Sequence, residues 1–264
     1  MSLSQRSFES VTRLFQQVSG IQLTDAKRQL VIGRLQRLAA ERGVASLDGY
    51  VEQVVRGDDP DEVVRLVDRL TTNETYFFRE QKHFDFLAQW LAERPPAGEF
   101  RVWSAASSSG EEAYSIAMVL AEELGNKPWT ITGTDLSTAM VESARRGLYP
   151  MDRARGIPDA WLRRYCMKGL APYENQMLVS AELRARTRFL CANLMQALPD
   201  IGAFDVIFLR NVLIYFDPRA KQEIVQRVMT RLKPGGILMT GHAESLANYD
   251  LGLRSLQSAV YARA

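Results

Sequence analysis

The segment Arg101-Val-Trp-Ser-Ala-Ala-Ser-Ser-Ser-Gly-Glu-Glu-Ala-Tyr-Ser-Ile-Ala-Met118 reads as a buried strand, a turn of small residues and a helix that starts on two glutamates. This order is typical of an α/β sheet, in which a small-residue loop lets the backbone approach a nucleotide-like ligand. Glu111 and Glu112 occupy the helix start, where a phosphate would otherwise bind. Since two carboxylates there repel a pyrophosphate, the segment favours a cationic or hydroxyl-rich ligand.

A third carboxylate supports this interpretation. Asp135 ends the next predicted strand, a position from which an acidic residue accepts hydrogen bonds from both ribose hydroxyls. Together the carboxylates indicate S-adenosylmethionine rather than NAD or ATP, because its sulfonium, amino group and ribose all suit carboxylate partners. Two alternatives remain open. Asp135 would also serve as a cap for the helix near Ser137, and acidic residues in a first turn complement the helix dipole whatever the function.

The bulk composition is that of an ordinary globular protein. Of the 264 residues, 46% are hydrophobic and 24% are charged, and a net charge of +2 does not demand a nucleic-acid partner. No apolar run approaches the ~18 residues of a membrane span, and the N-terminus lacks the apolar core of a signal peptide. Two cysteines and two histidines, far apart in sequence, predict neither a disulfide framework nor a transition-metal site. We therefore expect a cytoplasmic protein without membrane insertion.

The order of predicted helices and strands along the sequence indicates two domains. Residues 1–70 show helical spacing throughout, with capping residues at Thr24-Asp25, Ser46 and Asp59-Pro60 and glycine stops at Gly20 and Gly43. Residues 71–98 form a linker and connecting helix. From residue 99 to 264 strands and helices alternate, which predicts a mostly parallel sheet. The alternation lapses at about 148–190, where Met177–Ser180 and Thr187–Leu190 are expected to be strands of a small antiparallel insertion.

Two further segments carry polar groups that suit a binding site. Asn73, Thr75 and Arg79 alternate with three consecutive aromatic residues at the domain junction, which favours a cleft between the domains. The alternative is a helix capped by Thr72 or Asn73, with the aromatic side chains in an interdomain core.

The segment Arg210–Phe216 follows a predicted strand at Phe204–Leu209 and therefore lies at the ligand-binding edge of the sheet. It lacks the Asn/Asp-Pro-Pro-aromatic signature of enzymes that methylate nucleic-acid bases. We interpret Ile214 as a core residue.

Five motifs, in order, resemble those of the chemotaxis receptor methyltransferases, the CheR family. They are Thr72–Glu80, Ser104–Glu112, Gly133–Ser137, Arg210–Phe216 and Gly241–Leu246. The resemblance spans nearly the whole chain. It implies an all-helical N-terminal domain and a Rossmann-like class I methyltransferase domain with a small antiparallel β-insertion.

The resemblance also implies the site. The residues expected to contact the cofactor are Asn73, Thr75, Arg79, Glu112, Asp135, Asn193, Leu194, Arg210 and Asn211. Arg79 and Tyr215 would lie nearest the transferred methyl group as catalytic residues. Glu111 would then only complement the helix dipole. The reaction would convert S-adenosylmethionine to S-adenosylhomocysteine, with no metal, and would esterify glutamates. Because a carboxylate is already ionised at neutral pH, no general base is required.

The implied partner is the cytoplasmic helical bundle of chemoreceptors. Five basic residues between positions 27 and 42 suit docking to it, although a solvated helix explains them equally well: Lys27, Arg28, Arg34, Arg37 and Arg42. Some family members bind a receptor C-terminal peptide at the insertion through a glycine-rich turn. The turn Lys168–Pro172 has one glycine, which leaves such tethering open. Two rival functions are another O-methyltransferase on the same fold and a cofactor-binding sensor without activity.

Overall fold

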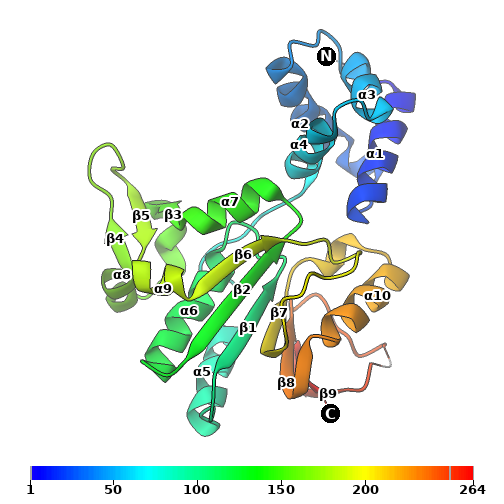
Figure 1. Cartoon of the computed structure of the whole chain (residues 1–264). Helices are drawn as coiled ribbons and strands as arrows, with labels where there is room; N and C mark the ends of the chain where they lie inside the picture. Colours follow the sequence, from blue (N-terminus) through cyan, green and yellow to red (C-terminus); the bar gives the residue numbers. More distant parts are fainter. Residues whose placement is uncertain (1, 250, 264) are drawn as a thin grey trace.

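A helical domain precedes an α/β domain in the computed structural model, which describes residues 2–249 and 251–263 (Figure 1). The helices of the first domain are α1 (Gln5–Ser19), α2 (Arg28–Glu41), α3 (Leu47–Arg56) and α4 (Pro60–Leu70), with a short 3-10 turn at Asp25–Lys27. The predicted capping residues and glycine stops act on the ends of their own helices. The Ser46 hydroxyl accepts the N–H of Gly49 at 3.0 Å, and Gly20 ends α1 at φ 76°. Apolar faces of all four helices pack into one core.

The second domain is built on a seven-stranded sheet of order β6-β2-β1-β7-β8-β10-β9. Its strands are β1 (Phe100–Ala105), β2 (Trp129–Asp135), β6 (Thr187–Cys191), β7 (Phe204–Leu209), β8 (Leu232–Thr240), β9 (Leu253–Gln257) and β10 (Val260–Arg263). The first five strands of that order run parallel, and β10 runs antiparallel to both of its neighbours. The helices of this domain outside the insertion are α5 (Lys82–Glu93), α6 (Glu111–Leu124), α7 (Thr138–Arg146) and α10 (Pro218–Met229).

The insertion is smaller than predicted. It comprises β3 (Leu148–Pro150), α8 (Asp159–Tyr165), β4 (Cys166–Lys168), β5 (Gln176–Val179) and α9 (Ala181–Ala185), with a 3-10 turn at Met151–Gly156. Its sheet has the order β3-β5-β4. The assignment of Thr187–Leu190 to this insertion was wrong, because these residues pair with β2 in parallel as the edge of the main sheet. A short strand has the same local pattern in either sheet.

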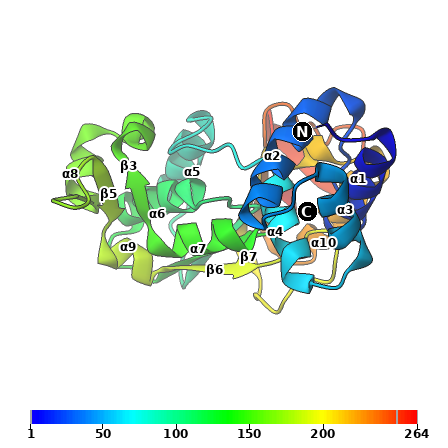
Figure 2. The ribbon, with the colours of Figure 1, turned by 90° about the horizontal axis from the view of Figure 1, so that it is seen from above.

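The helical domain is joined to the α/β domain by specific contacts. The Asn193 amide donates to the carbonyl of Val18 in α1 at 2.7 Å, and the Thr138 hydroxyl donates to the carboxylate of Asp68 in α4 at 2.7 Å. Seen from above, α1–α4 stand over the half of the molecule that contains β7 and α10, and the insertion lies at the other end (Figure 2). Within residues 2–249 and 251–263, no helix combines the length and the hydropathy required to cross a bilayer.

Candidate functional site

The carboxyl ends of β1, β2 and β7 meet beneath the helical domain and form the floor of a cavity. Ala105 of β1 pairs with Thr134 of β2 and with Leu209 of β7, so the loops after these strands emerge side by side. The cavity wall includes every residue that the resemblance assigned to the site: Asn73, Thr75, Arg79, Glu112, Asp135, Asn193, Leu194, Arg210, Asn211 and Tyr215. These residues are up to 142 positions apart in the chain, yet the structure brings them to one place.

Asp135 holds the loops on both sides of it. One carboxylate oxygen accepts the N–H of Ser108 at 2.8 Å, and the other accepts the N–H of Ser137 at 2.9 Å. Burial raises the pKa of Asp135 to about 6, and these backbone hydrogen bonds limit the rise. Each oxygen keeps accepting capacity toward the cavity. Asp135 therefore caps the backbone near Ser137, as the alternative proposed, and orients the small-residue loop. Because it also faces the cavity, this capping role does not exclude ligand binding.

The small-residue loop adds a group that sequence reasoning missed. The Ser107 hydroxyl is buried, lines the cavity and has no hydrogen-bond partner among the residues that the structure describes. An orphaned buried hydroxyl in the same cavity wall as the Asp135 carboxylate suits a ligand that both donates and accepts hydrogen bonds, as a ribose diol does. The cavity residues therefore fit the adenosyl part of S-adenosylmethionine. Nothing in the sequence distinguishes Ser107 from its two serine neighbours.

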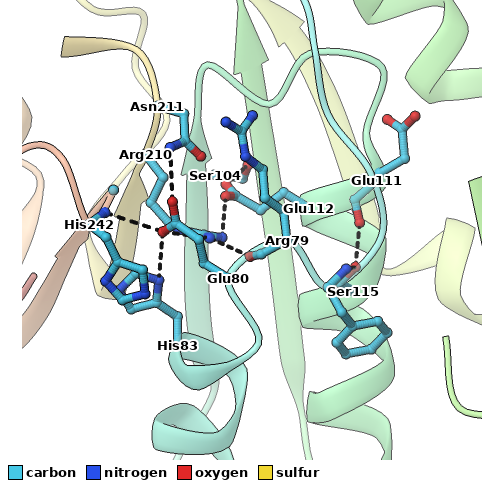
Figure 3. A network of polar contacts seen from close by, with 12 residues as sticks. Arg79, Glu80, His83, Ser104, Glu111, Glu112, Ser115, Arg210, Asn211 and His242 are labelled. Atoms are coloured by element: carbon cyan, nitrogen blue, oxygen red, sulfur yellow. Dashed lines mark hydrogen bonds and ion pairs between the residues drawn. The ribbon is translucent and has the colours of Figure 1, made fainter. Parts of the chain in front are cut away.

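Glu112 and Arg210 form the centre of a buried ionic network (Figure 3). Glu112 accepts from the Ser104 hydroxyl at 2.7 Å and from Arg210 Nη1 at 2.9 Å. Arg210 Nη2 donates to the carbonyl of Arg79 and to Glu80 Oε2, the latter at 3.1 Å. Burial raises the pKa of Glu112, and the positive charge of Arg210 opposes that rise. The network therefore joins β1, α6, the end of β7 and the segment before α5.

Glu111 does more than complement the helix dipole. It is 1% exposed and points away from the network of Glu112 (Figure 3). Its carboxylate accepts from the Ser109 hydroxyl at 2.6 Å and from Arg153 Nη1, in the insertion, at 3.0 Å. Arg153 Nη1 also donates to the carbonyl of Thr75 at 2.8 Å. Glu111 is therefore a structural link between α6, the insertion and the cavity wall, so the expectation that it would only complement the helix dipole was wrong.

The segment 71–81 is irregular, so the expectation of a helix capped by Thr72 or Asn73 was wrong. Phe78 and Glu80 have positive φ angles of 57° and 58°, which no helix accommodates. Long-range partners take the backbone groups that a helix would use, as in the bond from the Phe78 N–H to the Ser115 hydroxyl at 2.9 Å. Phe77 and Phe78 are buried as expected, whereas Tyr76 is 47% exposed.

Strained backbone is concentrated around the cavity. Asn211, at the end of β7, has φ 56°, and Ala106 and Ser108 in the small-residue loop have φ 64° and 49°. With Phe78 and Glu80, these are five of the seven described non-glycine residues with positive φ. Such strain persists where surrounding contacts over-determine it, and it is characteristic of functional sites.

Some residues predicted to contact the cofactor form hydrogen bonds within the protein. Asn193 donates to Val18 and accepts the N–H of Met195 at 2.9 Å, so its amide holds α1 against the α/β domain. The carbonyl of Asn73 accepts from the Ser108 hydroxyl at 3.2 Å. The loop between α1 and α2 also lines the cavity through Ile21, Gln22, Leu23 and Lys27, which the sequence did not indicate.

Arg79 and Tyr215 lie on the wall of the cavity with few internal partners. Arg79 Nη1 donates to the carbonyl of Glu74 at 2.7 Å, and its guanidinium lies 5.9 Å from the Tyr76 ring centroid. Burial raises the pKa of Tyr215, and the charge of Arg79 opposes the rise, so the phenol is neutral at pH 7. The interpretation of Ile214 as a core residue was wrong, since it is 50% exposed in a short 3-10 turn at Leu213–Tyr215.

His83 and His242 meet behind the network although they are distant in sequence. Their ring centroids are 4.7 Å apart and the rings are 24° from parallel, with Glu80 Oε2 3.4 Å from His83 Nδ1. In-plane lone pairs of nearly parallel rings do not converge, so this arrangement suits stacking better than shared metal coordination. Burial and the nearby charge of Arg210 lower the pKa of His83 to about 4, which keeps its imidazole neutral.

Comparisons with known proteins agree along the chain. The family model described as "CheR methyltransferase, SAM binding domain" matches residues 73–262, and the model "CheR methyltransferase, all-alpha domain" matches residues 6–71. A chemotaxis protein methyltransferase of Escherichia coli (strain K12) is 38% identical, covering 99% of this chain and 92% of the relative. Chemotaxis protein methyltransferase 2 of Pseudomonas aeruginosa is 36% identical, covering 99% and 94%.

Solved structures give a weaker likeness. The glycopeptide N-methyltransferase MtfA complexed with S-adenosyl-L-methionine is 18% identical, with a TM-score of 0.36 over 59% of this chain and 48% of that one. A score of this size adds nothing to the family models and the full-length relatives.

Proposed function

Since the chain belongs to the CheR family and is an S-adenosylmethionine-dependent methyltransferase of the chemotaxis type, we propose that it binds its cofactor in the described cavity and esterifies receptor glutamates there. The observation that carries the placement is the gathering of ten residues, predicted from five separate parts of the chain, on one cavity wall. Asp135 and Ser107 would hold the ribose, and Arg210, Asn211 and Glu112 would surround the amino-acid portion.

The proposed chemistry makes few demands on the protein. When bound, S-adenosylmethionine supplies an electrophilic methyl group on a positively charged sulfur. A glutamate oxygen forms a bond to that methyl carbon while the carbon–sulfur bond breaks, and the electron pair returns to sulfur, so no proton moves. Opposite charges neutralise each other in this step, which a water-poor, partly apolar cavity favours. The protein would contribute mainly alignment of the two reactants.

Arg79 and Tyr215 are the residues proposed to align the substrate carboxylate. Arg79→Ala is expected to lower kcat about a hundredfold, and Tyr215→Phe by roughly tenfold, because small misplacements of reacting groups cost that much. Initial rates of labelled methyl transfer onto receptor measure both effects. Tyr249→Phe, which lies outside the cavity, is the matched control. Full activity in both cavity variants would contradict this placement.

The reaction itself is tested with labelled cofactor and purified receptor. The proposal expects label on the receptor that mild base releases as methanol, the behaviour of a glutamate ester. Label on small molecules alone would favour another O-methyltransferase. Absence of transfer despite tight cofactor binding would favour a sensor. The bundle that carries the glutamates is cytoplasmic in the family, so we also place the enzyme in the cytoplasm.

Receptor docking on α2 rests on fewer residues than the sequence suggested. Arg28 donates to Gln5 and to the Leu3 carbonyl, Arg42 pairs with Asp59 and Glu62, and Arg34 donates to the carbonyls of Leu70 and Thr71. These three side chains therefore stabilise the helical domain. Lys27 lines the cavity. Arg37 is exposed, with no partner among the described residues, and so remains the cleanest probe of docking.

Arg37→Glu is expected to raise the KM for receptor about three- to tenfold, because reversing a surface charge mainly weakens electrostatic encounter. The Kd for S-adenosylmethionine should not change. Arg254→Glu on β9, at the far end of the molecule in Figure 1, makes the same charge change as a control. Titrations at low and high salt give the measurement. An unchanged KM at low salt would exclude Arg37 from the docking surface.

The insertion offers an open strand edge for a receptor tail. Within the described part of the chain β4 pairs only with β5; Met167 in β4 is 51% exposed, and Leu170 in the turn after it is 80% exposed. A short receptor C-terminal segment would add along β4 as a further strand, with backbone hydrogen bonds supplying affinity. Calorimetry with tail peptides measures this binding directly.

A further inference from the structure

Glu80 is a charged residue at the end of the first motif that received no role there and that does not line the cavity. It lies directly behind Arg210, and its side chain is 17% exposed. One carboxylate oxygen accepts from the Asn211 amide at 3.1 Å. The other accepts from Arg210 Nη2 at 3.1 Å and from the His242 N–H at 3.3 Å (Figure 3). Glu80 therefore contacts two cavity residues from outside the cavity.

Its backbone is held in a strained conformation for this purpose. A φ of 58° is unfavourable for glutamate, and the next residues begin α5. In this conformation the side chain meets Arg210 and Asn211, which follow β7, and the N–H of His242, which follows β8. A residue that served only to start a helix would not need this geometry.

The charges around the cavity give Glu80 a second role. Three carboxylates and three cationic side chains line the cavity, so the lining is neutral as a set: Glu74, Glu112, Asp135, Lys27, Arg79 and Arg210. Glu80 stands just outside this set and adds a negative charge, as does the buried Glu244, which accepts the N–H of Asn211 at 2.7 Å. Burial alone would raise the pKa of Glu80, but the Asn211 hydrogen bond and the charge of Arg210 hold the pKa below its usual value, so Glu80 is ionised.

We propose that Glu80 is a positioning residue, which holds Arg210 and Asn211 on the cavity wall, and that its negative charge contributes more to binding of the cationic cofactor than to binding of the neutral product. S-adenosylmethionine carries a net charge of +1 and S-adenosylhomocysteine carries none, so only the first gains from that charge. This inference rests on the proposed placement of the cofactor in the cavity.

The test separates the charge of Glu80 from its contacts. Glu80→Gln removes the charge and places an amide NH₂ opposite existing donors, whereas Glu80→Asp keeps the charge but shortens the reach. Glu80→Gln should weaken binding of S-adenosylmethionine by about ten- to a hundredfold, since buried donors lose their partner, and of S-adenosylhomocysteine by a clearly smaller factor. Glu80→Asp should weaken the binding of both ligands and leave the ratio of their Kd values near that of the unmodified protein.

Calorimetry of the full chain with each ligand gives these ratios, and thermal unfolding shows that each variant is folded. Asp85→Asn, one turn into α5 and exposed, removes the same charge without touching the network. Equal losses for both ligands in Glu80→Gln would overturn the electrostatic role, and unchanged affinities would overturn the proposal as a whole. If Asp135→Asn also leaves both affinities unchanged, the placement of the cofactor is wrong; if it weakens them, only the role of Glu80 is.

Discussion

Arg210→Met is expected to lower the free energy of unfolding of the α/β domain by about 3–5 kcal/mol, the usual effect of removing one partner of a buried ion pair. The Arg210 side chain is 1% exposed and pairs with both Glu112 and Glu80. Its removal leaves two carboxylates without a counter-charge, and it also removes the guanidinium packing against Phe84, whose ring centroid is 5.5 Å away. Urea unfolding followed by fluorescence and circular dichroism measures the change.

The loss of unfolding free energy in Arg210→Met should grow as pH rises. Burial already raises the pKa of Glu112, and without Arg210 that pKa rises further. When the pKa of a carboxyl is higher in the folded state than in the unfolded state, the unfolded state loses its proton first as pH rises. The variant should therefore lose stability as pH rises. The difference from the unmodified protein is therefore larger at pH 8 than at pH 5.

Two further variants separate the buried network from ordinary surface pairing. Arg219→Met breaks an exposed pair with Glu223 and should change stability little. Arg210→Met combined with Glu112→Gln removes an unpaired charge and should recover part of the lost stability. A single variant as stable as the control would mean that water reaches the network and compensates the loss.

The parts of the site that the sequence predicted are those in which chemistry and local pattern coincide. A strand, a small-residue loop and a helix with acidic residues at its start can form only a few geometries, so the acidic pair and Asp135 were expected at the ligand-binding edge of the sheet, and the family resemblance then selected Glu112 from the pair. Capping residues such as Ser46 and Asp59 likewise identified helices of the first domain, because a cap is bonded within its own first turn.

The parts that failed depend on distant partners. Segment 71–81 has helical composition, yet Arg210 and Ser115 bind its backbone from more than thirty residues away. Thr187–Cys191 has the same appearance in an insertion as in a main sheet, and only its pairing with β2 decides. Arg34 reads as a surface charge, while the structure uses it to fix the end of α4. Glu80 lies within the first motif, but nothing local indicates its role, because its three donors come from two other strand ends.

Asp135→Asn is the second variant with a large expected effect, because it replaces the carboxylate proposed to hold the ribose. The amide has one acceptor where the carboxylate has two, so either the Ser108 or the Ser137 N–H, or a ribose hydroxyl, loses its partner. We expect cofactor affinity at pH 8 to fall by about ten- to a hundredfold, the range for one or two buried hydrogen bonds to a charged group.

The same residue predicts how cofactor binding depends on pH. The pKa of Asp135 lies at about 6 because the carboxyl is buried, and the ionised form is the one that accepts from both hydroxyls. Affinity in the unmodified protein should therefore be full above pH 7 and fall as pH drops through 6, since binding then requires loss of a proton. Asp135→Asn has no proton to lose and should show a flat profile over that range, as measured by calorimetry at constant ionic strength.

Asp200→Asn, 95% exposed at its side chain, should keep the sloping profile of the unmodified protein. A flat profile in the unmodified protein, or a slope retained by Asp135→Asn, would assign the pH dependence to another group and remove Asp135 from the proposed ribose contact.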